Sequence, residues 1–180
     1  MAKKKIEFEV PQMPPEVRIN QLQKAMWYLV ARIVRVVKDK YGEEGSRTIY
    51  EGLKNWENNM ITVRKAGLEP GKVSIEELLT KVYAPGDALL FTMKEKQEIT
   101  EEPDENRLLY RIKDCNVAKL IEKECPETCR IVAGAMIDRM TEAANPDFVA
   151  THDKFIAEGC DGCYVYVEKK PRKKPAKKSK

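Results

Sequence analysis

Apolar residues recur every three or four positions through the first third of the chain, which is the period of an amphipathic helix. The clearest run covers residues 16–41, and Gly42 supplies a stop signal after it. The apolar members of this run are Leu22, Met26, Leu29, Ile33, Val36 and Val37. A second helix is expected over residues 43–66, ended by Gly67, with Ile49, Leu53, Trp56 and Met60 on one stripe.

The pattern changes after these two helices. Ser74 and Glu77 have the spacing of a capping box, which predicts a short third helix. Apolar and polar residues then alternate over residues 89–99 and again over 108–113, with the polar stretch 100–105 between them. Two strands joined by a turn have this pattern, so we expect a hairpin.

The last third combines helices with strands. A helix is expected to begin at Cys115, and a longer one covers residues 127–144 until an Asn-Pro pair ends it. Two more strands are expected at residues 148–156 and 163–167. The order of elements predicts an α+β fold, in which N-terminal helices pack on a mostly antiparallel sheet interrupted by a helix pair.

Charge divides the chain into three parts. The 33 Lys and Arg residues exceed the 29 Asp and Glu residues, which gives a formal net charge of +4. Three of the cations lie in an extended lead-in at residues 1–14, and eight lie in a Lys/Pro-rich tail at 169–180, which we expect to be disordered. The single domain expected between them, residues 15–168, is acidic. This excludes a nucleic-acid reader with a basic face, except for non-specific contact by the tail.

The sequence also indicates a cytoplasmic location. The N-terminus has no apolar segment of the kind found in a secretory signal. A membrane span needs about 18 apolar residues, and the longest apolar run, at residues 27–37, is interrupted by Arg32 and Arg35. Five cysteines lie in the last third of the chain, and an odd, clustered number favours metal or thiol chemistry over a disulfide scaffold.

Four of these cysteines form two close pairs. Cys125 and Cys129 are four residues apart and would share one face if both lay in a helix. Cys160 and Cys163 form a CxxC at a glycine-flanked turn. Four thiolates suit zinc or a [4Fe–4S] cluster, and the sequence does not choose between them. The alternative is that they are buried thiols with a packing role only.

A thiol mechanism is the other candidate. Cys115 stands at the start of a helix, where the helix dipole lowers the pKa of a thiol. His152 is the only histidine of the chain and could face the strand of Cys163, so it is the candidate general base. Asp138 and Glu142, four residues apart, are expected on the outer face of their helix.

Segments of the C-terminal half resemble the L-2-amino-thiazoline-4-carboxylic acid hydrolase-like family. They are DCNVA at residues 114–118, the segment 129–136, the Asn145-Pro146 pair and GCDGCYVY at 159–166. That family has a cysteine after a strand, one in the next helix and one opening the last strand. Cys115, Cys129 and Cys163 occupy these three places.

The resemblance implies a small cytosolic α+β protein. The named member of that family opens a cyclic amidine by hydrolysis, and the architecture is also similar to small-molecule-binding domains of the 4-vinyl-reductase type. Cys125 and Cys160 depart from the hydrolase pattern and raise the metal hypothesis.

Two functions therefore compete. In the first, Cys115 or Cys163 attacks a small cyclic amidine or thiazoline-type molecule, with His152 as base. In the second, the four paired cysteines hold a metal or cluster in an accessory or electron-transfer subunit or a ligand sensor. The expected partners are a small-molecule ligand or a larger enzyme complex, and homo-oligomers remain open.

Overall fold

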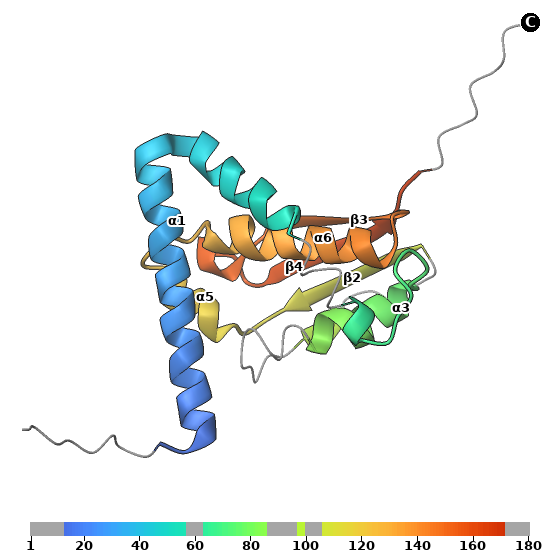
Figure 1. Cartoon of the computed structure of the whole chain (residues 1–180), viewed down its shortest axis with the longest axis horizontal. Coiled ribbons are helices and arrows are strands. Elements are labelled where there is room, and N and C mark those ends of the chain that lie inside the picture. The colour runs from blue at the N-terminus through green and yellow to red at the C-terminus, as the bar shows by residue number, and fades with distance from the viewer. Residues whose placement is uncertain (1–12, 57–62, 86–96, 100–105, 172–180) are drawn as a thin grey trace, which may run out of the picture.

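The computed structural model describes residues 13–56, 63–85, 97–99 and 106–171, and it has the α+β architecture that the sequence predicts (Figure 1). Its helices are α1 (Pro15–Lys54), α3 (Ile75–Glu77), α5 (Asn116–Ile121) and α6 (Gly134–Ala144). The π-helical turn η1 (Leu78–Tyr83) continues α3, η2 (Cys129–Ala133) leads into α6, and η3 (Ile156–Glu158) is a short 3-10 turn. The strands are β1 (Gln97–Ile99), β2 (Arg107–Ile112), β3 (Phe148–Lys154) and β4 (Cys163–Lys169).

The strands form one antiparallel sheet in the order β1-β2-β4-β3. The predicted pairing of the first two strands is confirmed, although residues 89–96 and the turn at 100–105 lie outside the described residues. β4 pairs with both β2 and β3, so the chain between β2 and β3 supplies the helix pair that interrupts the sheet.

One face of the sheet carries the core. Directly paired residues share a face, and alternate residues along a strand also share one. The buried members of this face are Leu108, Tyr110, Ile112, Phe148, Val165 and Val167. The rings of Tyr83 on η1 and Tyr110 on β2 lie 5.6 Å apart, so η1 also packs on this face.

Gly42 interrupts α1 as the sequence predicts. It has φ 62° and ψ −146°, a backbone conformation that is essentially reserved for glycine, and the helix changes direction there. Figure 1 shows the part before Gly42 crossing one end of the molecule and the part after it folding back over α6. The second part is shorter than expected, because helical structure ends at Lys54. Residues 57–62 are outside the described range, and 63–65 are helical again before Gly67, where φ is 73°.

Charged side chains tie α1 to the segment between α5 and η2. Arg32 Nη1 donates to Glu124 Oε1 at 2.9 Å, and Arg35 Nη1 donates to the Glu124 carbonyl oxygen at 3.0 Å. Lys38 Nζ likewise donates a hydrogen bond to the Glu127 carboxylate. The Lys38 bond holds the pKa of Glu127 below its usual value, so this contact favours the ionised carboxylate.

The capping box is confirmed. The Ser74 hydroxyl accepts the backbone N–H of Glu77 at 3.2 Å, and the Glu77 carboxylate accepts the backbone N–H of Ser74 at 3.2 Å. No helix within the described residues is long and apolar enough to cross a membrane.

Candidate functional site

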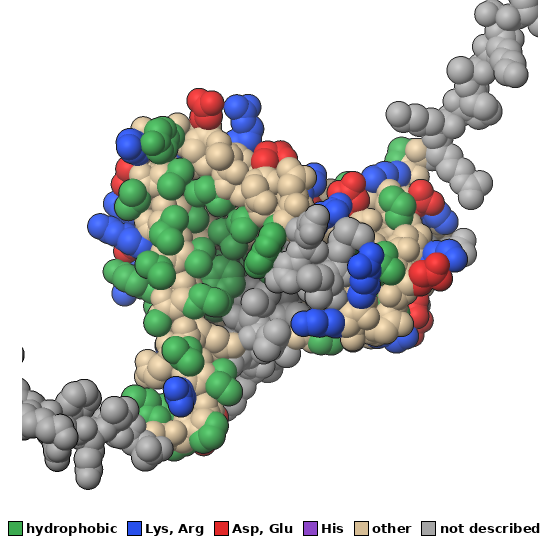
Figure 2. All heavy atoms as spheres, viewed as in Figure 1, with side chains coloured by type: hydrophobic (Ala, Val, Ile, Leu, Met, Phe, Trp, Pro, Cys, Tyr) green, Lys and Arg blue, Asp and Glu red, His purple; other side chains and the backbone are tan. Residues whose placement is uncertain are grey.

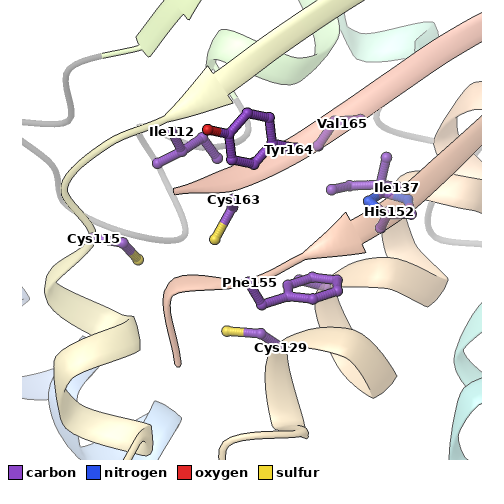
Figure 3. Close-up of a pocket in the computed structure, with 10 residues that line it drawn as sticks. Ile112, Cys115, Cys129, Ile137, His152, Phe155, Cys163, Tyr164 and Val165 are labelled. Carbon is purple, nitrogen blue, oxygen red and sulfur yellow. The ribbon is translucent and has the colours of Figure 1, made fainter. Parts of the chain in front are cut away.

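A small cavity lies between the sheet and the η2–α6 helix, and three cysteines line it (Figure 3). Its volume is about 40 Å³. The lining residues are Ile112, Cys115, Cys129, Ala133, Ile137, His152, Phe155, Cys163, Tyr164 and Val165. Most of this lining is apolar, so the thiols and one imidazole supply the reactive groups.

Strand register explains why distant residues meet there. Ile112 pairs with Cys163, and His152 pairs with Val165, two residues further along β4. All four side chains therefore lie on the face of the sheet that η2 and α6 cover. The sequence-based expectation that His152 faces the strand of Cys163 agrees with this register.

Two of the three thiols accept a backbone hydrogen bond. The Cys163 sulfur accepts the N–H of Ile156 at 3.3 Å, and the Cys115 sulfur accepts the N–H of Ala118 at 3.3 Å. Cys115 is thus the N-cap of α5, which confirms the predicted helix start. An N–H donated to sulfur favours the thiolate over the thiol.

Cys129 differs from these two thiols. It lies in the π-helical turn η2 and is buried, and burial raises the pKa of its thiol well above the ordinary value. The nearby Cys163 and Cys115 sulfurs act in the same direction, because a second thiolate would repel the first. Cys129 therefore remains a neutral thiol beside the other two sulfurs of the cavity.

An acid–imidazole pair borders the cavity. His152 Nε2 lies 3.1 Å from Asp138 Oδ1, and the Tyr50 hydroxyl donates to Asp138 Oδ2. The His152 side chain is only 8% exposed, and its Nδ1 has no hydrogen-bond partner among the described residues. The expectation that Asp138 lies on an outer face is wrong, because it joins α1, α6 and β3. Glu142 is exposed, as expected, and its carboxylate lies 3.6 Å from the Arg139 guanidinium.

The predicted four-cysteine metal site is wrong for the part of the chain that is described. No group of three or more His, Cys, Asp or Glu side chains there could hold a metal ion. Cys125 precedes the helix instead of lying in it, so it does not share a helix face with Cys129. Its sulfur approaches Glu127 Oε2 at 3.5 Å, and Cys160 does not line the cavity.

Trp27, Tyr28 and Trp56 do not line the cavity. Of Trp27, Tyr28, Trp56 and Phe91, Trp27 alone is known to be buried, Tyr28 and Trp56 are exposed, and Phe91 is outside the described residues. Met60, expected on the stripe of Trp56, is also outside them.

A second candidate site lies on the outside of α1. The core face of this helix contains Trp27, Ala31 and Val34, which are buried. A second apolar stripe points away from the core, and each of its residues is between 43 and 61% exposed. We call this stripe the α1 seam; it consists of Ile19, Leu22, Met26, Leu29, Ile33 and Val36. Figure 2 shows the apolar side chains of this helix gathered on one surface of the molecule.

Comparison with known proteins identifies a shared fold with a solved structure. No family model matches the sequence, and no curated protein matches it. Among solved structures, the chain is similar to trafficking protein particle complex subunit 3 from Naegleria fowleri, solved with palmitic acid covalently bound. The TM-score is 0.54 at 13% sequence identity, over 84% of this chain and 97% of that one. The two chains therefore share a fold.

This similarity corrects the resemblance drawn from short motifs. The chain has the fold of a trafficking-complex subunit, and no model of the hydrolase-like family matches it. The assignment to that family was wrong, and so was the hydrolysis of a cyclic amidine that it implied. The accessory role based on four metal-holding cysteines, which came from their spacing, was wrong as well. Zinc or a [4Fe–4S] cluster as a cofactor stays an untested prediction.

Proposed function

We propose that this protein is a building block of a multiprotein assembly and docks to another protein through the α1 seam. The observation that carries the proposal is the exposure of six large apolar side chains in one row. Monomeric soluble proteins rarely expose a contiguous apolar patch of this kind, and a larger patch marks an interaction site. The structurally similar Naegleria protein is a complex subunit, which supports the same role.

A complex-size measurement in the native host tests this role. Leu29→Glu places a charge in the middle of the seam, and Val149→Glu makes the same change at an exposed apolar residue on β3. Native electrophoresis of extracts should show the protein in a large complex, displaced to small species by Leu29→Glu and unchanged by Val149→Glu. A complex of the same size with Leu29→Glu would contradict the proposal.

We propose a second role for the cavity, as a thiol site for a small apolar molecule. Cys163 supplies the reacting thiol, with Cys115 as the alternative. His152 lines the same cavity and its Nδ1 makes no hydrogen bond to either sulfur, so it takes up the proton through a bridging water or the bound molecule. Asp138 holds the imidazole in place by accepting at Nε2. The size of the cavity limits the ligand: an engineered cavity of about 150 Å³ binds benzene, and this one is about 40 Å³. A long acyl chain like that in the Naegleria structure does not fit it as it stands.

Thiol labelling tests the second role. A small neutral reagent such as methyl methanethiosulfonate should modify Cys163 faster in the wild-type protein than in His152→Phe, because the variant lacks the proton acceptor. Cys160, which is half-buried and does not line the cavity, serves as an internal control and should react at the same rate in both proteins. Equal rates at Cys163 in the two proteins would contradict the role given to His152.

A further inference from the structure

The spacing of the α1 seam identifies the kind of partner that fits it. Its residues alternate steps of three and four along the helix, from Ile19 to Val36. This is the a/d pattern of a coiled coil, in which two helices cross at a shallow angle and interlock side chains. The apolar row ends at both sides, since the next positions are Pro15 and Lys40. The partner surface is therefore a helix with an apolar row of about the same length.

The chain itself supplies such a helix. We propose that two copies of this protein associate through their α1 seams in antiparallel orientation. This inference rests on the proposed docking function and names the occupant of the surface. In an antiparallel pair, Ile19 faces Val36 of the partner subunit, Leu22 faces the partner's Ile33 and Met26 faces the partner's Leu29. All six apolar residues of each copy are covered, with none left over.

Charged residues beside the seam favour this orientation. Arg18 and Asp39 occupy the equivalent flanking position at the two ends of the seam, and both are exposed. Asp39 also lies 3.7 Å from Arg35 of its own chain, so it would be shared between Arg35 and the partner. In an antiparallel pair, Arg18 lies beside the partner's Asp39, and the two-fold axis repeats the contact. A parallel pair would instead place Arg18 beside the partner's Gln23 and Arg32 beside the partner's Val37, which gives no opposite-charge contact.

The other flank of the seam is occupied by the molecule's own core. Val30 and Val37 lie on that flank and are half-buried against the body. Arg32 and Arg35, on the solvent side, are already held by Glu124. Among the described residues, the approach to the seam is thus open from outside, and the helix that presents it is fixed to the rest of the chain.

Light scattering coupled to gel filtration tests the proposal on the full chain. The wild-type protein should have twice the 20.7 kDa mass of one chain. Leu22→Glu should elute at the mass of one chain, while Val149→Glu, an equal change at an exposed apolar site on β3, should keep the doubled mass. Circular dichroism of each variant verifies that the fold is retained. A wild-type protein with the mass of one chain at every concentration would overturn the proposal.

Charge reversal tests the orientation. Arg18→Glu should raise the dimer Kd by about tenfold, because two like-charge contacts replace two opposite-charge ones. Adding Asp39→Arg to the same chain should restore the Kd, since the pair is then reversed and complementary. Failure of the second change to rescue the first would overturn the antiparallel arrangement.

The outcome also separates this inference from the docking function. A wild-type chain of single mass, combined with loss of the native complex in Leu29→Glu, means that a different protein covers the seam. In that case self-association is refuted and the docking function stands. If the seam variants keep the native complex and also keep the doubled mass, the docking function and the self-association are both refuted.

Discussion

At the scale of single residues, the five cysteines have different environments, and reactivity should follow them. Burial raises the pKa of Cys129, whereas Cys160, in the loop before β4, is only half-buried. At mildly alkaline pH, a maleimide should therefore label Cys160 at least about tenfold faster than Cys129 in the native protein. Peptide mass spectrometry measures both sites in one sample. In urea the two rates should converge, and equal rates in the native protein would contradict the buried position of Cys129.

Asp138 accepts hydrogen bonds from two elements, and its loss should be costly. Desolvation, reinforced by the Asp138 carboxylate, raises the pKa of Tyr50, so its hydroxyl remains a donor. Asp138→Asn removes an ionised acceptor from Tyr50 and His152 and should lower the free energy of unfolding by about 1–3 kcal/mol. Glu142→Gln, on the same helix, should stay within about 0.5 kcal/mol of the wild type. Urea unfolding measures both; similar values for the two variants would argue against the Tyr50–Asp138–His152 contact.

The sequence contains local signals that predict where some of these side chains lie. Cys125 immediately precedes Pro126, and a residue before proline is disfavoured in a helix. That local rule already argued against a helical Cys125–Cys129 pair, so the metal hypothesis was avoidable. Asp138 lies on the same helical stripe as Gly134 and Thr141, both buried, which was a signal that it faces inward. Its contact with Tyr50 was not available, because it depends on how α1 folds back.

At the scale of elements, two of the three glycines of α1, Gly42 and Gly52, should respond in opposite ways to replacement by alanine. Gly42 has a positive φ, so Gly42→Ala should destabilise the protein by about 1–3 kcal/mol through backbone strain alone. Gly52 is helical with open space around it, and Gly52→Ala should stabilise by up to about 1 kcal/mol. Chemical denaturation distinguishes the two. If Gly42→Ala leaves the free energy of unfolding unchanged, α1 is not bent as described.

The contact between α1 and η2 should make stability depend on acid. Lys38 holds the pKa of Glu127 below 4.5, its ordinary value, so the folded state binds the proton less readily than the unfolded state. The stabilisation is therefore present above that value and is lost as the pH falls through the lowered pKa. Lys38→Met should flatten this part of the curve of stability against pH. The urea concentration at the midpoint of unfolding is measured against pH. The same slope in the wild type and in Lys38→Met would contradict the contact.

Helix periodicity located α1 but not the face that it buries. The run that predicts the helix shares five of its six residues with the α1 seam, which is exposed, while Trp27, Ala31 and Val34 form the buried face. Both faces have helical spacing, and no local property of the sequence decides which of them meets the core. That choice depends on packing against α5, η2 and α6, which involves residues far away in the chain.

At the scale of the whole molecule, the fold separates the two candidate sites in space. The thiol cavity lies inside, between the sheet and the helix pair, and the α1 seam lies outside. A change in the seam should leave the cavity intact: Leu22→Glu should not alter the labelling rate of Cys163 by a small neutral reagent. A changed rate would show that the two sites are linked through α1.

The most direct test of the central claim is the molecular mass of the wild-type chain in solution, measured by sedimentation equilibrium over a wide range of concentrations. If the α1 seam is an interface between two copies, the mass should rise towards twice 20.7 kDa, and Leu22→Glu should remain at the mass of one chain. A wild-type protein that sediments as one chain throughout, or a Leu22→Glu variant that doubles like the wild type, would contradict it.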